Sequence, residues 1–408
     1  MPPKAGKQSG AGQAPLLEPA CSQPRFDINH LYVHLPFCQE KCHYCSFATY
    51  TLDSNHDSEN LFLDYFSALK ANLDAATRFF GPQSFETVYW GGGTPSVVPL
   101  PYLHEFLGWL RREHTMQKNA ELTFECNPNS LSGEKIEAYQ SMGINRISVG
   151  VQSLHPAAFN RLGRAHSIEQ SRAVILELKR RQFPNWSVDL MFGLPYQTLE
   201  QLKTDVQQIL AWGPPHISIY GLMLEKATPF GNTLRAHQSP LPSEDTEADM
   251  YEYLLTQLPK HGYNNYEISN FALAGFESRH NLAYWTGKNY LGLGLSAASL
   301  VDGQRFSQSQ NLSKYLQNPC LDYLRLMERP VARQARLSEK LFLMLRTRDG
   351  LRPAALNPWE LRQFTEHKAK ILAKWTSSRH VLWQPDSAAW KLSLKGKLVA
   401  NEIMAELV

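Results

Sequence analysis

Between residues 30 and 225, short apolar runs alternate with longer amphipathic stretches, and this alternation constrains the fold of the 408-residue chain more than any other feature. The amphipathic stretches carry apolar residues at three- and four-residue steps, which predicts helices. The apolar runs, which predict strands, span residues 31–36, 86–92, 121–127, 146–152, 186–195 and 216–224. Strands that alternate with helices predict a parallel sheet and an α/β fold, because parallel neighbours need a crossover of a dozen or more residues.

The carboxyl ends of the predicted strands carry polar or glycine residues, and functional groups of parallel α/β folds gather at these ends. The first strand leads into three cysteines, and the second into the turn GGGTPS at residues 91–96. This turn has no lysine and no GxGxxG spacing, which argues against a P-loop or a dinucleotide site. The next three strands end at Glu125, Gln152 and Asp189. Five consecutive strands therefore deliver candidate ligands to one rim.

Three of the six cysteines, Cys38, Cys42 and Cys45, fall within eight residues. Six cysteines in a chain of this length are too few for a disulfide scaffold. Thiolates at this spacing favour a [4Fe–4S] cluster in which one iron has no protein ligand. A zinc site would want a fourth Cys or His at compatible spacing, so zinc is a weaker alternative, as are three unrelated structural cysteines.

Taken in order, the motifs resemble those of the radical S-adenosylmethionine (radical SAM) superfamily, which has a CxxxCxxC loop after the first strand and a GGGTP turn after the second. Within it, the chain is similar to the HemN/HemW group of coproporphyrinogen-oxidase-like proteins over roughly residues 30–300. The resemblance implies a partial (β/α)6 barrel. The motifs that carry it are LYVHLPFCQEKCHYCSF, YWGGGTPS, ECNPNSL, GINRISVGVQS, LGRAH, SVDLMFGLP, YEISNFA and RHNLAYW.

The resemblance also implies how S-adenosylmethionine (SAM) is bound. The open iron of such clusters chelates the amino and carboxylate groups of SAM. Carboxylates suit its ammonium, sulfonium and ribose groups, and Arg164 suits a carboxylate through paired charge-assisted hydrogen bonds. The resemblance places Tyr32 beside SAM, Tyr44 and Phe47 at its adenine end, Gly92, Gly93 and Thr94 at its methionine end, and Glu125, Gln152, Arg164 and Asp189 at its remaining contacts.

Two features separate the branches of this group. The coproporphyrinogen dehydrogenase branch has the motif CxxxCxxCxC, but this chain has Phe47 at the position of the fourth cysteine. RHNLAYW matches the HNxxYW motif that is associated with haem binding in the other branch, HemW. Histidine is a common axial ligand of haem iron, and aromatic rings stack on porphyrins. The expected haem contacts are His280, Asn281, Tyr284 and Trp285, and a structural histidine with core aromatics is the alternative.

One departure from the family pattern concerns a second histidine. Where HemW proteins commonly carry GxGAHS, this chain reads GLSAAS, with Ala298 at the histidine position. Any role of that histidine, including haem ligation, is therefore in doubt here. His280 becomes the better candidate for a haem ligand.

These observations predict a haem chaperone that binds haem as cargo and passes it to acceptor proteins such as respiratory cytochromes. The alternative is an oxygen-independent coproporphyrinogen III dehydrogenase, against which Phe47 and RHNLAYW weigh. If SAM is cleaved, an electron donor is a further partner, and a homodimer stays open. The formal charge of +3 is too small and dispersed for a nucleic-acid partner, and membrane contact is expected only through an acceptor.

The chain divides into three predicted parts. Residues 1–27 are rich in Pro, Gly, Ala and Gln and predict a disordered extension without a signal-peptide core. Residues 28–305 form the expected radical SAM domain with its HemW-type extension, and residues 306–408 a C-terminal winged-helix-like α+β domain. No apolar run reaches the roughly 20 residues that a membrane span needs. We expect a soluble protein in the reducing cytoplasm, with an organellar form left open.

Overall fold

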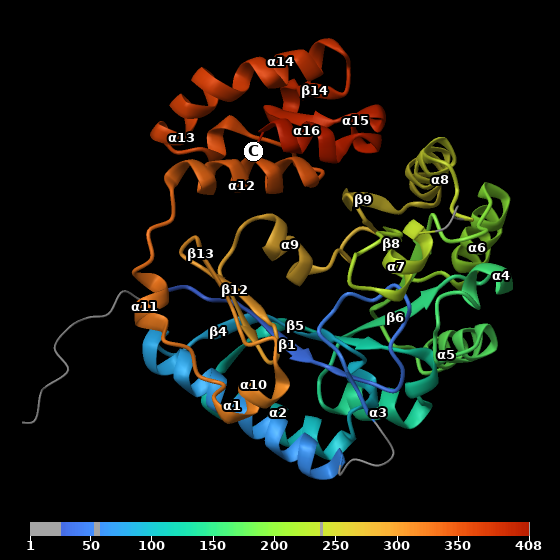
Figure 1. Cartoon of the computed structure of the whole chain (residues 1–408), viewed down its shortest axis with the longest axis vertical. Coiled ribbons are helices and arrows are strands. Elements are labelled where there is room, and N and C mark those ends of the chain that lie inside the picture. The colour runs from blue at the N-terminus through green and yellow to red at the C-terminus, as the bar shows by residue number, and fades with distance from the viewer. Residues whose placement is uncertain (1–25, 53–57, 237–239, 408) are drawn as a thin grey trace, which may run out of the picture.

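The computed structural model describes residues 26–52, 58–236 and 240–407. The expected disordered extension lies outside the described residues, except for its last two. Among the described residues, an 11-stranded sheet forms the centre of the molecule (Figure 1). The predicted α/β fold is confirmed, and each predicted strand overlaps a strand of this sheet.

The middle of the sheet is parallel, with neighbours in the order β1–β4–β5–β6–β7–β8. These strands span His30–Leu35 (β1), Ser84–Gly92 (β4), Thr115–Cys126 (β5), Arg146–Gln152 (β6), Trp186–Phe192 (β7) and His216–Gly221 (β8). Because all of them run in one direction, their carboxyl ends meet at one rim.

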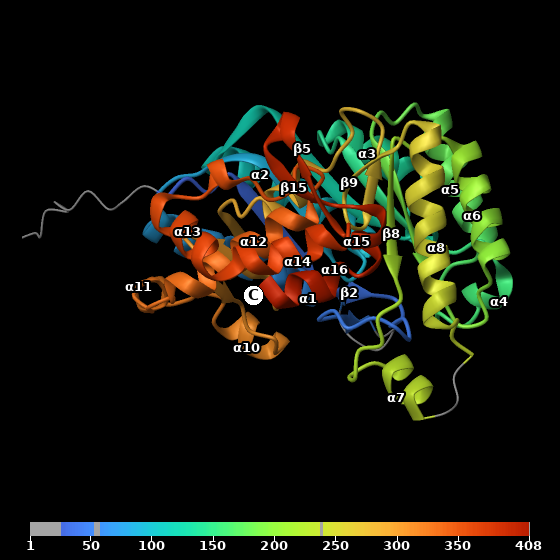
Figure 2. The same cartoon turned by 90° about the horizontal axis from the view of Figure 1, so that it is seen from above.

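Helices connect the parallel strands and lie along the outer side of the sheet (Figures 1 and 2). The two helices that begin at residues 168 and 199 have capping boxes, in which Ser167 pairs with Gln170 and Thr198 with Gln201. The local sequence therefore determines where these helices start. The helices are α1 (Ser58–Phe80), α2 (Leu100–Glu113), α3 (Gly133–Ser141), α4 (Pro156–Phe159), α5 (Ile168–Arg180) and α6 (Leu199–Trp212).

The two faces of the parallel sheet differ in polarity. In β1, Leu31, Val33 and Leu35 belong to the hydrophobic core that the sheet shares with the helices. The alternate residues of the parallel strands are mostly polar and point to the inner side, because successive side chains of a strand alternate between faces. They include His30, His34, Thr87, Glu125, Arg146, Ser148, Ser187, Asp189, His216 and Ser218. Parallel sheets are usually apolar on both faces, so a polar inner face indicates a space built for a ligand.

Further strands extend the sheet on both sides. β11 (Tyr290–Leu293) pairs with β1 in parallel, followed by the antiparallel β12 (Ala298–Val301) and β13 (Gln304–Ser307). Beyond β8 lie the antiparallel β10 (Asn270–Ala272) and β9 (Asn264–Glu267). The sheet of the described residues has β13 and β9 at its two edges and does not close, as a partial barrel requires. The same region contains α7 (Pro229–Ala236), α8 (Glu244–Gln257) and α9 (Arg279–Trp285).

A second hydrophobic cluster marks the C-terminal unit, which Figure 1 shows above the sheet. Its buried side chains begin at Leu337, whereas Tyr315 and Tyr323 still pack in the main core. The predicted domain boundary at 305/306 falls inside β13, and we propose that it lies instead between α11 (Tyr323–Met327) and α12 (Arg333–Arg346). The helices before it are α10 (Leu312–Gln317) and α11 (Tyr323–Met327).

The C-terminal unit has the predicted order of helices followed by a small β-ribbon. The ribbon is an antiparallel pair of two four-residue strands. The winged-helix resemblance of this unit stays a prediction. Its elements are α12 (Arg333–Arg346), α13 (Pro358–Gln363), α14 (Ala369–Ser377), β14 (Val381–Gln384), β15 (Ala389–Leu392), α15 (Leu394–Leu398) and α16 (Ala400–Leu407).

Within the described ranges, each helix is too short or too polar to cross a bilayer.

Candidate functional site

A cavity of about 330 Å³ opens at the rim where the parallel strands end. Its wall is made by residues from the cysteine loop, the glycine turn and the inner face of the sheet. Most residues that the sequence predicts for this site line it together, although they come from segments more than 100 residues apart. The predicted residues in its lining are Cys38, Cys42, Tyr44, Cys45, Phe47, Gly92, Gly93, Thr94, Glu125, Gln152, Arg164, Asp189 and Asn281.

The cysteine loop is held on both sides by short pairings. β2 (Phe37–Cys38) pairs in parallel with β3 (Tyr50–Thr51), which closes the loop at its base. The Thr94 hydroxyl donates to the Sγ of Cys38 at 3.6 Å, and Arg164 Nη1 donates to the Sγ of Cys42 at 3.7 Å. Burial raises the pKa of the Cys38 thiol to about 11. The loop is thus tied to the sheet through two of its three sulfurs.

The three thiols face one cavity without converging on a point. No three His, Cys, Asp or Glu side chains of the described residues surround a common centre as the ligands of a single metal ion would. A [4Fe–4S] cluster is coordinated at separate iron corners, so its ligands need not converge. The donor set therefore fits a cluster better than a zinc ion.

The glycine turn lets the chain pass close to its neighbours. Gly92 has a φ of +114°, and a Cβ at this position would lie 2.5 Å from the ring of His34. A Cβ on Gly93 would lie 2.6 Å from the backbone carbonyl of Pro36. Because only glycine fits these two positions, the turn holds its backbone against the strand that leads into the cysteine loop.

Glu125 is a half-buried carboxylate in the cavity wall. The Tyr89 hydroxyl donates to its Oε1 at 2.7 Å, and the Gly92 amide donates to its Oε2 at 3.2 Å. Burial raises the pKa of Glu125 to about 7, against the effect of these two hydrogen bonds. Near neutral pH this carboxyl is therefore present in both protonated and ionised forms. A nearby cation would favour the ionised form.

Asp189 and Gln152 complete the wall on neighbouring strands. The Ser148 hydroxyl lies 3.0 and 3.2 Å from the two carboxylate oxygens of Asp189, and burial raises the pKa of Asp189. Gln152 ends β6 with a φ of 70°, an unfavourable conformation for a residue other than glycine. Backbone strain of this kind is typical of functional sites.

Arg164 is almost saturated by protein acceptors. Its Nη1 donates to the Tyr44 hydroxyl at 3.0 Å as well as to Cys42, and its Nη2 donates to Asn127 Oδ1 at 2.7 Å and to the Gly150 carbonyl at 2.8 Å. Only Nε has no partner. The guanidinium therefore ties the cysteine loop to the ends of β5 and β6, and little of it is left for a ligand.

Tyr32 does not line the cavity but supports the cysteine loop through His34. Burial lowers the pKa of His34, so its ring is neutral and carries one N–H. His34 Nε2 lies 2.8 Å from the carbonyl of Ala48, which can only accept. The His34 Nδ1 must therefore accept from the Tyr32 hydroxyl at 2.9 Å. These two hydrogen bonds connect β1 to residue 48, three positions beyond Cys45.

His280 lies in the core of the molecule rather than at the cavity. Its side chain is fully buried, and burial lowers its pKa well below the usual value. Its Nδ1 lies 2.7 Å from the Thr87 hydroxyl and its Nε2 lies 2.8 Å from the Tyr284 hydroxyl. Its ring also stacks on Tyr89 at 5.0 Å. In this conformation neither ring nitrogen is free to ligate an iron.

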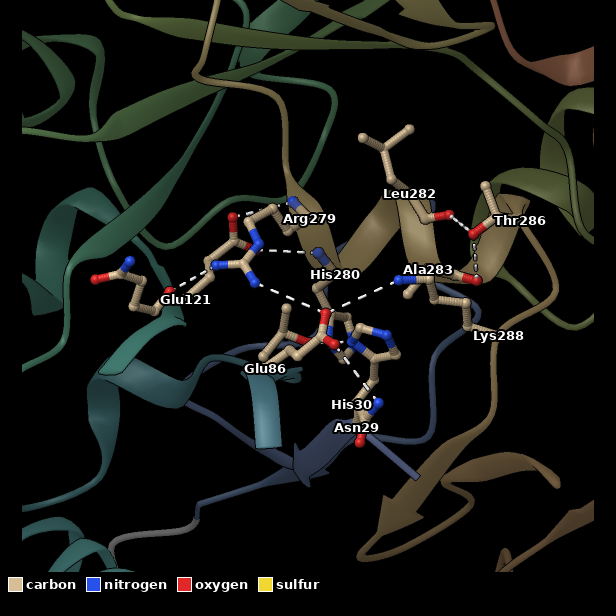
Figure 3. Close-up of polar contacts among 12 residues, drawn as sticks. Asn29, His30, Glu86, Glu121, Arg279, His280, Leu282, Ala283, Thr286 and Lys288 are labelled. Carbon is tan, nitrogen blue, oxygen red and sulfur yellow. Dashed lines mark hydrogen bonds and ion pairs between the residues drawn. The ribbon is translucent and has the colours of Figure 1, made fainter. Parts of the chain in front are cut away.

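Helix α9, which carries this histidine, is fixed at its start by two carboxylates, as Figure 3 shows. Glu121 on β5 accepts the backbone N–H of Arg279 at 3.0 Å and that of His280 at 3.1 Å. Glu86 on β4 pairs with Arg279 at 3.7 Å and with Lys288 at 3.8 Å. The helix therefore lies against the strands that form the cavity wall.

The other residues of the HNxxYW motif have different surroundings. Asn281 lines the cavity, the Tyr284 hydroxyl is bonded to His280, and the guanidinium of Arg346 lies 4.4 Å from the ring centroid of Trp285. The motif thus divides into a buried anchor, a contact with the C-terminal unit and one side chain at the cavity.

Several cavity residues are missing from the sequence prediction. Tyr89 lies inside β4 and Arg146 is the first residue of β6, so neither lies at the carboxyl end of a strand, although the alternation of polar residues in each strand is a usable signal. Tyr220 and Met223 lie at the mouth, where Met223 is 71 % exposed and Phe47 is 66 % exposed. Apolar side chains that remain exposed beside a cavity are typical of a binding surface.

Known proteins resemble this chain in sequence and in fold. Residues 32–209 match the family model of the radical SAM superfamily. The chain is 37 % identical over 328 residues to the "Heme chaperone HemW" of Lactococcus lactis, covering 79 % of this chain and 83 % of that protein. It is 31 % identical over 383 residues to the protein of the same name from Bacillus subtilis, covering 91 % and 97 %. The solved structure of Escherichia coli coproporphyrinogen III oxidase, HemN, matches with a TM-score of 0.79 at 20 % identity, covering 95 % of this chain and 91 % of that one.

Proposed function

Because this chain belongs to the HemW family, within the HemN/HemW group of the radical SAM superfamily, we propose that it is a haem chaperone that binds haem and delivers it to acceptor proteins. Acceptors of the respiratory cytochrome class are the expected recipients. The observation that carries the proposal is Phe47, which lies exposed at the cavity mouth where the dehydrogenase branch has a fourth cysteine.

The proposal includes a [4Fe–4S] cluster and SAM bound in the cavity. A bound [4Fe–4S] cluster with one open iron would offer a coordination site for the amino and carboxylate groups of SAM. Cys38, Cys42 and Cys45 would hold the cluster at the edge of the cavity. Glu125 and Asp189 would face the cationic groups of SAM and the ribose hydroxyls.

The exposed apolar mouth supports haem as the cargo. Phe47, Tyr220 and Met223 are large and exposed side chains in the lining of one cavity, and apolar or aromatic side chains can cover a porphyrin face. Asn281 is the member of the HNxxYW motif that reaches this cavity. We propose that haem lies over the mouth, with the motif contributing through Asn281 rather than through ligation by His280.

The proposal is tested by reconstituting the cluster anaerobically and offering haem and coproporphyrinogen III in parallel, each with SAM and a reductant. The expected result is a stable haem complex, seen by its visible absorption, with no protoporphyrinogen formed. SAM-dependent decarboxylation of coproporphyrinogen would instead establish the dehydrogenase reading, which the fold of HemN also accommodates.

SAM affinity is expected to rise with pH through the titration of Glu125. The pKa of this carboxyl is raised to about 7, so it is largely protonated at pH 6 and largely ionised at pH 8. Cationic SAM prefers the ionised form, so binding at pH 6 must first release the proton. The affinity should therefore increase about tenfold between pH 6 and pH 8.

This pH dependence can be measured by equilibrium dialysis of SAM with the cluster-loaded protein. Glu125→Gln removes the titrating group and keeps the shape of the side chain. The variant should bind SAM more weakly at pH 8 and with a flat profile, and an unchanged profile would assign the titration to another group.

A further inference from the structure

Arg146 carries a buried guanidinium without a partner. It is the first residue of β6, only 1 % of its side chain is exposed, and it lines the cavity. Its Nε is buried and unbonded, and its guanidinium forms no hydrogen bond or ion pair with any residue that the structure describes. A buried cation is costly unless it is paired, so a side chain of this kind indicates an anionic ligand.

The neighbouring carboxylates do not form an ion pair with Arg146. Glu125 and Asp189 line the same cavity, and the positive charge of Arg146 lowers the pKa of both, but neither carboxylate lies within ion-pair distance of it. Arg164, the other arginine of the cavity, donates to four protein acceptors. Arg146 is therefore the guanidinium that is available to a ligand.

The position of Arg146 restricts which anion it can meet. Arg146, Ser148, Gly150 and Gln152 all line the cavity, so Arg146 stands three alternate positions below Gln152, the last residue of β6. Its charge contributes to the low pKa of His280, which places it near α9. Asn281 of the same helix lines the cavity, and its side-chain amide forms no hydrogen bond with the described residues. Two donors thus face the lower part of the cavity together.

We propose that Arg146, assisted by Asn281, binds one propionate of the tetrapyrrole, which extends into the lower cavity from the ring at the mouth. A guanidinium offers paired N–H donors that match a carboxylate. The carboxylate of SAM is expected at the open iron on the rim, away from Arg146. The inference rests on the proposed haem binding, and Arg146 is the residue that would recognise one end of the haem.

The experiment compares haem with haem dimethyl ester, whose propionates are blocked. Both are titrated into the anaerobically reconstituted full-length protein and into Arg146→Gln, and SAM binding is measured on the same samples. Wild-type protein should bind haem about 10- to 100-fold more tightly than the ester, as expected for hydrogen bonds to a charged group. Arg146→Gln should bind both alike, and its SAM affinity, measured at pH 8 where Glu125 is largely ionised, should be unchanged. Arg172→Gln, an exposed arginine on α5, serves as the control and should retain the wild-type preference.

The alternatives have separate signatures. Equal binding of haem and ester by the wild type, or a haem affinity that Arg146→Gln leaves unchanged, would overturn the inference while the haem chaperone proposal stands. A loss of SAM affinity alone would assign Arg146 to SAM and would equally overturn it. Failure of the wild type to bind either porphyrin would refute the proposed function itself.

The melting temperature of the ligand-free protein serves as the control for correct folding of the variant. Since Arg146 has no partner there, Arg146→Gln should not lower it. A marked fall would make Arg146 a structural charge and would contradict the inference. Arg146→Lys keeps the charge without the paired donors and should retain part of the preference for haem over the ester.

Discussion

Replacement of Cys42 by serine is expected to abolish iron retention after anaerobic reconstitution. The wild type should hold about four irons per chain, and the variant less than about one, because a hydroxyl is a poor ligand for the iron of a cubane. Cys42 also lies at the middle of the loop, where Arg164 Nη1 meets its sulfur at 3.7 Å. Iron and acid-labile sulfide analysis, together with visible absorption, give the measurement.

Cys320→Ser is the matched control for this prediction. Cys320 is half-buried between α10 and α11, where its thiol donates to the carbonyl of Ala71 at 3.7 Å, and it does not line the cavity. This variant should retain the full iron content. A cluster that survives in Cys42→Ser would mean that the ligands have been assigned wrongly.

Replacement of His280 by alanine is expected to lower the free energy of unfolding by about 3 kcal/mol. The change removes a fully buried ring and the hydrogen bonds that it forms with the hydroxyls of Thr87 and Tyr284, and the Thr87 hydroxyl keeps only its contact with His30. It also removes the surface on which Tyr89 stacks, and Tyr89 donates to Glu125. SAM and haem affinity should therefore fall together. Urea unfolding and parallel SAM and haem titrations are the measurements.

Two comparisons separate this positioning role from ligation of iron. Tyr284→Phe removes only the hydrogen bond between the Tyr284 hydroxyl and His280, so the free energy of unfolding should fall by about 1 kcal/mol. Imidazole added to His280→Ala can replace a missing axial ligand but cannot rebuild the packing of a buried helix. We expect no rescue of the haem spectrum. A spectrum restored by imidazole would show that His280 reaches the iron in the haem complex.

The parallel strands and the rim could be predicted from sequence because they depend on local patterns. An apolar run followed by a polar or glycine residue is visible in the letters, and it led to Glu125, Gln152 and Asp189, which line one cavity. The domain boundary could not be read in this way. Residues 304–307 form an edge strand of the large sheet through pairing with β12, which is a tertiary contact without a local signal.

The environment of an individual side chain could not be predicted from the sequence either. A histidine in a motif with Asn and Tyr suggests a ligand, but only the fold shows that the two nitrogens of His280 are occupied by the hydroxyls of Thr87 on β4 and of Tyr284 on its own helix. Arg146 shows the reverse case. It is the first residue of its strand, whereas the sequence prediction considered only residues at the carboxyl ends of strands. What marks it is the absence of a partner among the described residues, which only the structure shows.

The separation of the sheet into an apolar outer face and a polar inner face has an evolutionary consequence. The packing that stabilises the fold uses one set of alternate positions, and the contacts with a bound molecule use the other. Mutations at inward positions can thus alter what is bound while the hydrophobic core is left intact. Proteins of one fold can differ in what they bind by this route, and the match to HemN at 20 % identity shows that this architecture accommodates very different sequences.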